Sequence, residues 1–188
     1  MQIMIGARAT ALKVATEFKA THVIRIGQNL SGRKKFFFLP KQAVLLLPLE
    51  STNIKVELIE QLIEFVEKLP ADARLFIHCA SGMTRSASAA IIAACAVDRA
   101  TEPSVHYKRM LQINPRIVPQ KNMLAIADSL LGLQGRLQRY SEQDRSERLS
   151  NLKPLEVAAN HHHEINNRRT RVPFYLRFYL RLKFALIK

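Results

Sequence analysis

One short segment of the sequence brings together residue types that can do covalent chemistry on a phosphate. In residues 75–88, LFIHCASGMTRSAS, Cys79 is followed by five residues and then by Arg85 and Ser86. A cysteine thiolate is a strong nucleophile, and the planar guanidinium of an arginine can bind two oxygens of one phosphate. The five small or flexible residues, with Gly82 free to adopt a positive φ, let the backbone N–H groups turn toward an anion. The spacing predicts a phosphate cradle with a sulfur nucleophile at its base.

The other side chains of this loop have simpler predicted roles. Ser86 can hydrogen-bond the sulfur and make it a better leaving group. His78, at the end of a buried strand, is interpreted as a structural residue that orients the loop and not as a ligand. The alternative reading of Cys79, a structural cysteine in a turn, leaves Gly82, Arg85 and Ser86 unexplained. The phosphate-binding residues that we expect are Ala80, Ser81, Gly82, Met83, Thr84 and Arg85.

The elements on either side of the loop are suited to position it. Residues 74–78 predict a strand that ends at the carboxyl edge of a parallel sheet, where such sheets bind ligands. Residues 85–97 are almost all small or apolar, and a helix without a polar face is a buried, central helix. The positive end of its dipole would strengthen the field at the anion site and depress the pKa of the Cys79 thiol.

Strand and helix patterns alternate through the rest of the chain. Apolar runs predict strands at residues 3–5, 22–26 and 43–49. Helical periodicity predicts helices near residues 8–20, 54–69, 102–112 and 120–131. This alternation is typical of an α/β domain, and we expect a central, mostly parallel sheet of about four or five strands flanked by helices.

The loop matches the His-Cys-x5-Arg-Ser pattern of the protein tyrosine phosphatase superfamily, which the segment resembles. Residues 22–32, 75–96 and 114–137 are similar to segments of small bacterial predicted tyrosine phosphatases, which are related in architecture to dual-specificity phosphatases. The resemblance covers roughly residues 1–140 and implies a three-layer phosphatase domain. It also implies hydrolysis of phosphate monoesters, with phosphotyrosine on proteins as the expected substrate, through a cysteinyl-phosphate intermediate and without a cofactor or metal.

Two positions of the family pattern are less regular here. Relatives supply an aspartate as general acid from the loop before the long helix, whereas residues 45–53, LLLPLESTN, contain only Glu50 as a carboxylate. Glu50 is therefore the candidate acid, and the alternative is an exposed carboxylate that stabilises the helix N-terminus. Gln120 stands where relatives carry a Pro-Asn pair and can position the attacking water; otherwise it is an ordinary first residue of a helix.

Charge and cysteine content suggest the surroundings of the protein. The net charge is +14, and half of it falls in residues 145–188. We therefore expect a basic extension over residues 141–188, of uncertain order, that can dock on an anionic membrane surface or a partner protein. The alternative is that its end is a packed terminal helix or strand of the domain, or a poorly folded extension. We do not expect nucleic acid as a partner. The 2 cysteines and the lack of a signal peptide or long apolar span predict a cytoplasmic location.

Two other functions compete with the phosphatase hypothesis. A phosphate-binding adaptor would keep the cradle and lack an efficient general acid. Sulfur transfer and arsenate reduction also use cysteine loops, but rhodanese loops usually have a shorter Cys-to-Arg spacing. An arsenate reductase needs a resolving cysteine, and Cys95 would lie about 15 Å along the helix from Arg85.

Overall fold

The computed structural model of the protein describes residues 1–27, 39–40, 43–49, 53–152 and 182–183, with the side chains of 149, 151, 152, 182 and 183 excepted. Its centre is a 5-stranded sheet in the order β3-β2-β4-β1-β5. The first four strands are parallel, and β5 pairs antiparallel with β1. The mostly parallel sheet expected from the sequence is confirmed. The strands are β1 (Gln2–Ala7), β2 (His22–Ile26), β3 (Val44–Leu47), β4 (Arg74–Cys79) and β5 (Leu182–Lys183).

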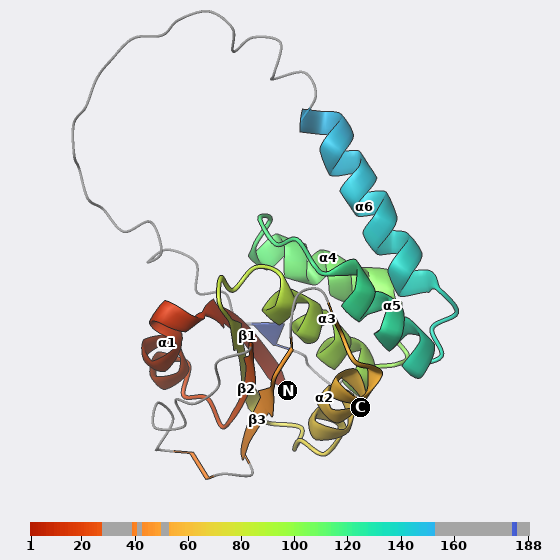
Figure 1. Ribbon diagram of the computed structural model, residues 1–188. Coiled ribbons are helices and arrows are strands. Elements are labelled where there is room, and N and C mark those ends of the chain that lie inside the picture. The colour runs from red at the N-terminus through yellow and green to blue at the C-terminus, as the bar shows by residue number, and fades with distance from the viewer. Residues whose placement is uncertain (28–38, 41–42, 50–52, 153–181, 184–188) are drawn as a thin grey trace, which may run out of the picture.

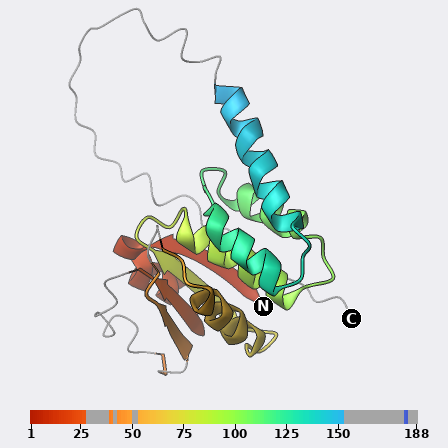
Figure 2. The same ribbon diagram turned by 45° about the vertical axis from the view of Figure 1, so that its right-hand side comes forward.

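Helices cover both faces of this sheet, as Figures 1 and 2 show. The short 3₁₀ helix η1 and helix α1 lie on one face, and α2 and α3 pack on the other. Helices α4 and α5 pack against α3, and α6 packs on α4 and α5. Two apolar clusters fill the interfaces, a small one under α1 and a large one under α2 and α3. The helices are η1 (Arg8–Thr10), α1 (Ala11–Glu17), α2 (Val56–Glu67), α3 (Arg85–Val97), α4 (Pro103–Ile113), α5 (Lys121–Leu130) and α6 (Arg136–Leu152).

Helix α3 is the centre of the large core, as its composition predicts. Residues from Ser86 to Ala96 are all buried, so the helix has no solvent face. Its alanines let the sheet and α2, α4 and α5 approach closely, while Ile91 and Ile92 fill the remaining space. Burial of each isoleucine side chain stabilises the fold by about 1.5–3 kcal/mol. The N-terminus of this helix, which follows the loop, is therefore held rigidly in place.

Helix α6 crosses the boundary that the sequence analysis places at residue 140. It begins at Arg136 and continues to Leu152, into the residues that the sequence analysis assigns to the extension. It docks through polar contacts: the Tyr107 hydroxyl donates to Asp144 at 3.2 Å, and Arg148 donates to the carbonyls of residues 115 and 117. The division into a domain of residues 1–140 and an extension of residues 141–188 stays a prediction.

Several predicted features lie outside the described residues. They include Glu50 and most of the basic extension, residues 153–181 and 184–188. Within the part of the chain that the structure describes, no helix has the length and apolar character needed to cross a membrane.

Candidate active site

The predicted loop lies where the parallel strands end. Strand β4 ends at Cys79, α3 begins at Arg85, and β4 runs between β1 and β2 in the sheet. In this register Cys79 lies beside Ala7, the last residue of β1. The nucleophile predicted from the sequence is therefore at the carboxyl edge of the sheet, next to the N-terminus of a buried helix.

Gly82 turns the loop back under itself. Its φ is +78°, and a Cβ at this position would come within 2.6 Å of the Gly6 carbonyl carbon. The turn aims the Gly82 N–H at the Cys79 Sγ, with the nitrogen and the sulfur 3.3 Å apart. A left-handed conformation pressed against another backbone accepts only glycine without strain. Gly82 is thus needed for the curl that the sequence predicts.

Two neighbouring segments fix the loop from opposite ends. The Arg8 N–H donates to the carbonyl of Ala80 at 3.3 Å, and the Val118 N–H donates to the carbonyl of Met83 at 3.2 Å. Each bond ties the loop to a different part of the chain, the segment after β1 and the segment before α5. The loop is therefore positioned by long-range contacts as well as by its own glycine.

The Cys79 sulfur lies in surroundings that favour the thiolate. The side chain is 1% exposed, and burial by itself raises the pKa of the thiol. Hydrogen bonds from the Ser86 hydroxyl, the Ser86 amide and the Gly82 amide, together with the charge of Arg85, outweigh burial and lower the pKa below its ordinary value. The Ser86 Oγ is 3.3 Å from the sulfur. A thiolate here is the reactive form of the residue.

Arg85 links the loop to the segment after β3. Its Nη1 donates to the carbonyl of Leu49 at 2.8 Å, and the side chain is half-buried. This bond fixes the plane of the guanidinium beside the loop. Leu49 is the last described residue before Glu50 in the sequence. The role of Glu50 itself stays a prediction.

Ser88 is a positioning residue that the sequence analysis missed. Its hydroxyl is fully buried and donates to the carbonyl of Thr84 at 3.0 Å. It also accepts the backbone N–H of Gln120 at 2.6 Å. Ser88 thereby connects the end of the loop to the start of α5, where Gln120 lies. The sequence signal that could have indicated this role is a hydroxyl side chain in a helix whose other residues are mostly apolar.

His78 lies on the opposite face of β4 from the Cys79 side chain. It is 4% exposed, its ring stacks on Phe76 with centroids 5.7 Å apart, and it is the register neighbour of Arg25 in β2. Phe76 belongs to the cluster under α1. This buried position agrees with a structural role, which remains a prediction.

The outer side of the loop exposes apolar surface. Met83 is 41% exposed and Val118 is 54% exposed, and the hydrogen bond between their backbones holds the two residues together. Of the predicted phosphate-binding residues, Ala80 and Ser81 are also exposed, while Thr84 is half-buried. The loop therefore has an apolar rim on the side of the segment that precedes α5.

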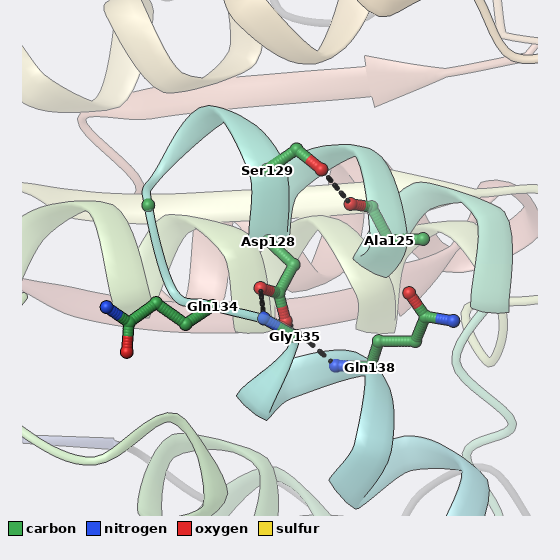
Figure 3. Close-up of a pocket in the computed structure, with 7 residues that line it drawn as sticks. Ala125, Asp128, Ser129, Gln134, Gly135 and Gln138 are labelled. Atoms are coloured by element: carbon green, nitrogen blue, oxygen red, sulfur yellow. Dashed lines mark hydrogen bonds between the residues drawn. The ribbon is translucent and has the colours of Figure 1, made fainter.

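A second hollow lies between α5 and α6, away from this loop, and Figure 3 shows it. The buried Asp128 carboxylate accepts hydrogen bonds from the N–H groups of Gly135 at 2.6 Å and Gln138 at 3.0 Å. These bonds satisfy the N-terminus of α6, so Asp128 acts as a cap. Across the described ranges, no three His, Cys, Asp or Glu side chains gather in a way that could hold a metal ion.

Solved structures with the same architecture define the class of fold. Human DUSP28 matches with a TM-score of 0.53 and 16% identity over 77% of this chain and 94% of that chain. The PTP-2 phosphatase of Cydia pomonella matches with a TM-score of 0.56 and 14% identity over 68% and 84%. A human tyrosine phosphatase-like serine/threonine/tyrosine-interacting protein matches with a TM-score of 0.54 and 18% identity over 70% and 92%.

The chain thus has the fold of these solved phosphatase structures, and the fold that the resemblance to the protein tyrosine phosphatase superfamily implies is confirmed. No protein-family model matches the chain, and the search of curated proteins gives no match either.

Proposed function

We propose that the protein hydrolyses phosphate monoesters, with Cys79 as nucleophile and Arg85 as the phosphate-binding arginine. The observation that supports this most strongly is the Cys79 sulfur, which accepts the Gly82 N–H and contacts the Ser86 hydroxyl at the carboxyl end of β4. A buried thiol with a lowered pKa beside an arginine is an arrangement for nucleophilic attack on an anionic ester. Solved structures with this fold include a protein named as a phosphatase, which adds to the case.

In the first step the Cys79 thiolate attacks phosphorus. A bond forms between sulfur and phosphorus, and the bond from phosphorus to the ester oxygen breaks. Arg85 and the loop amides bind the non-bridging oxygens, where negative charge accumulates. The leaving oxygen takes a proton from a general acid, for which Glu50 is our candidate; such a proton transfer contributes about 10²–10⁴ in rate.

In the second step water attacks the cysteinyl phosphate. A bond forms between the water oxygen and phosphorus, the bond from sulfur to phosphorus breaks, and inorganic phosphate leaves. The electron pair returns to the sulfur, and the Ser86 hydroxyl, 3.3 Å away, stabilises the thiolate that forms. Glu50 would take the proton of the water, and Gln120, connected to the loop through Ser88, would position it.

We propose aryl phosphates, phosphotyrosine on proteins in particular, as the substrate class. The exposed apolar rim of Met83 and Val118 offers a surface on which an aromatic ring can pack. The loop itself contains no lysine, whereas enzymes of this superfamily that favour highly charged phosphoinositides often add basic residues there. A reducing compartment would keep the thiol active, and we propose the cytoplasm.

The test is hydrolysis of 4-nitrophenyl phosphate by the purified full chain. We expect turnover that vanadate inhibits, that a chelator leaves unchanged, and that Cys79→Ser abolishes. Cys95→Ala is the matched control, because burial and the nearby Asp128 and Asp98 raise the pKa of that thiol to about 12 and make it inert. Wild-type protein without turnover, or equal losses in both variants, would contradict the proposal.

A phosphate-binding adaptor is the second candidate. One solved structure with this fold is named a phosphatase-like interacting protein, so the fold occurs in proteins described by interaction. An adaptor would bind a phosphopeptide without hydrolysing it. Turnover of the phosphopeptide by the wild-type protein separates the two, because an adaptor has none. If turnover is found, the pH dependence of kcat in Glu50→Gln tests the acid: loss of the basic limb assigns that role to Glu50, and an unchanged profile removes Glu50 from the mechanism.

A further inference from the structure

Two arginines from distant parts of the chain meet over one glycine at the edge of the sheet. A Cβ placed on Gly27, just after β2, would lie 3.0 Å from the Arg8 Nη2 and 3.9 Å from the Arg85 Nη1. Both guanidinium groups are therefore within 4 Å of a single point. The missing side chain at Gly27 makes room for this approach. Arg8 was not among the residues that the sequence indicated.

A third arginine lies close to the same place. Arg25, in β2, is 4% exposed and stands two residues before Gly27. Because residues two apart along a strand face the same side, positions 25 and 27 both face the side of the sheet that α1 covers. Burial lowers the pKa of Arg25, and the positive charge of Arg8 lowers it further. The positive charge of Arg8 thus affects Arg25, and it also lies near the guanidinium of Arg85.

The position of Arg8 is fixed and its charge is exposed. Its backbone N–H bonds to Ala80 in the loop, so the residue cannot drift from the site without breaking that contact. Its side chain is on the surface, and no ion pair joins it to a carboxylate in the described ranges. Like charges held together cost free energy, and an anion bound between them offsets that cost.

We propose that Arg8 binds a second anionic group of the substrate, a phosphate or a carboxylate close to the phosphate monoester that Arg85 holds. This inference rests on the phosphatase function proposed above and names its substrate more narrowly. The second anion meets the fork of Arg8, which can form two parallel hydrogen bonds of about 2.7–2.9 Å to it. Arg8 supplies from the segment after β1 the cation that the loop between Cys79 and Arg85 does not contain.

The site therefore has two unlike rims. The rim at Met83 and Val118 is apolar and suits an aromatic ring, whereas the rim at Arg8 is cationic. A substrate that satisfies both is an aryl phosphate with an acidic group near the phosphate. The same chemistry occurs in a small doubly anionic ester and in a phosphotyrosine peptide with an acidic neighbour.

The first experiment compares 3-carboxyphenyl phosphate with its uncharged analogue 3-carbamoylphenyl phosphate. We expect the wild-type protein to prefer the carboxylate by about tenfold in kcat/KM, in line with one charge-assisted hydrogen bond. Arg8→Gln should remove this preference, and Arg8→Lys should keep part of it. Arg99→Gln is the matched control, because Arg99 is an exposed arginine beyond the far end of α3, about 20 Å away.

A parallel pair of phosphotyrosine peptides, with Asp or Asn next to the phosphotyrosine, identifies the source of the second anion. A preference for the Asp peptide that Arg8→Gln removes, with no preference in the aryl pair, assigns the site to peptides; the reverse assigns it to small esters. If Arg8→Gln changes neither ratio, the inference is wrong.

Binding separates this inference from the proposed hydrolysis. In Cys79→Ser protein, which cannot turn over, calorimetry gives the Kd of each aryl ester. A tenfold tighter Kd for the carboxylate that Arg8→Gln abolishes supports the second anion site even if the wild-type protein proves to be a binding module. Equal Kd values within the ester pair and also within the peptide pair, measured in the same protein, would overturn it, whatever the turnover.

Discussion

The turn around Cys79 and the turn around Asp128 share one backbone geometry but place different side chains in it. In each, a glycine with positive φ donates its N–H to a buried side chain: Gly82, at +78°, to the Cys79 Sγ, and Gly135, at +76°, to an Asp128 oxygen. At Asp128 the anion belongs to the fold and is satisfied by amides of α6 (Figure 3). At Cys79 the acceptor is the sulfur that we propose as the nucleophile, at the edge of the sheet. The same local turn geometry thus occurs with and without a proposed reactive group, and what distinguishes the turn at Cys79 is the sulfur with Arg85 beside it.

Removal of the sulfur has the largest expected effect on this comparison. Cys79→Ser should lower kcat by at least about 10⁴-fold, as loss of a nucleophile does in other enzymes, with little change in the melting temperature. Turnover of an aryl phosphate and a thermal scan check the two halves. Residual activity near the wild-type level would show that the reaction does not pass through Cys79.

The glycines themselves form a matched pair. Gly82→Ala should lower kcat/KM by about 10²-fold, because the new Cβ would come within 2.6 Å of the backbone of β1 and push the loop away from the sulfur. Gly135→Ala places its Cβ 2.9 Å from the flexible end of Arg139, which can move aside, so only about 1 kcal/mol of left-handed strain remains. Steady-state kinetics and thermal melts of both variants test this. Equal losses of activity would remove the distinction between the two turns.

Ser86→Ala should produce a smaller loss with a characteristic pH dependence. The hydroxyl helps to lower the pKa of Cys79, so its removal raises that pKa and moves the ascending limb of kcat/KM to higher pH. The sulfur also becomes a poorer leaving group, and kcat should fall by about 10–100-fold with a burst of the released alcohol. An unshifted limb would show that Ser86 does not act on the sulfur.

Asp128→Asn should have the smallest effect on turnover and a clear effect on stability. One of the two backbone N–H groups that now donate to the carboxylate would face the NH₂ group of the new asparagine. A buried donor left without an acceptor costs about 1–3 kcal/mol of folding free energy. We expect a lower free energy of unfolding and an unchanged kcat below the melting transition. A large loss of kcat in the folded variant would mean that the two turns are coupled.

The site and the fold were accessible from the sequence to different extents. Helix α3 was predicted with its observed bounds, Arg85–Val97, because the residues of this one segment indicate both its chemistry and its burial. Arg8 and Leu49 were not found, since their approach to Arg85 depends on how parallel strands bring distant segments to one edge. The start of α6 was not found, because its apolar positions are few: Leu137 and Tyr140 contact the core, and polar contacts such as that between Tyr107 and Asp144 hold the following turns.

Strand β4 is hydrogen-bonded along its length by β1 on one side and β2 on the other. The nucleophile therefore stands at the end of the segment whose amides should exchange with deuterium most slowly, since opening it requires both neighbours to separate. We expect heating to abolish turnover only when the whole sheet unfolds. Loss of turnover in a temperature ramp would then coincide with loss of the circular dichroism signal. The temperature at which turnover is lost would then report the temperature of global unfolding.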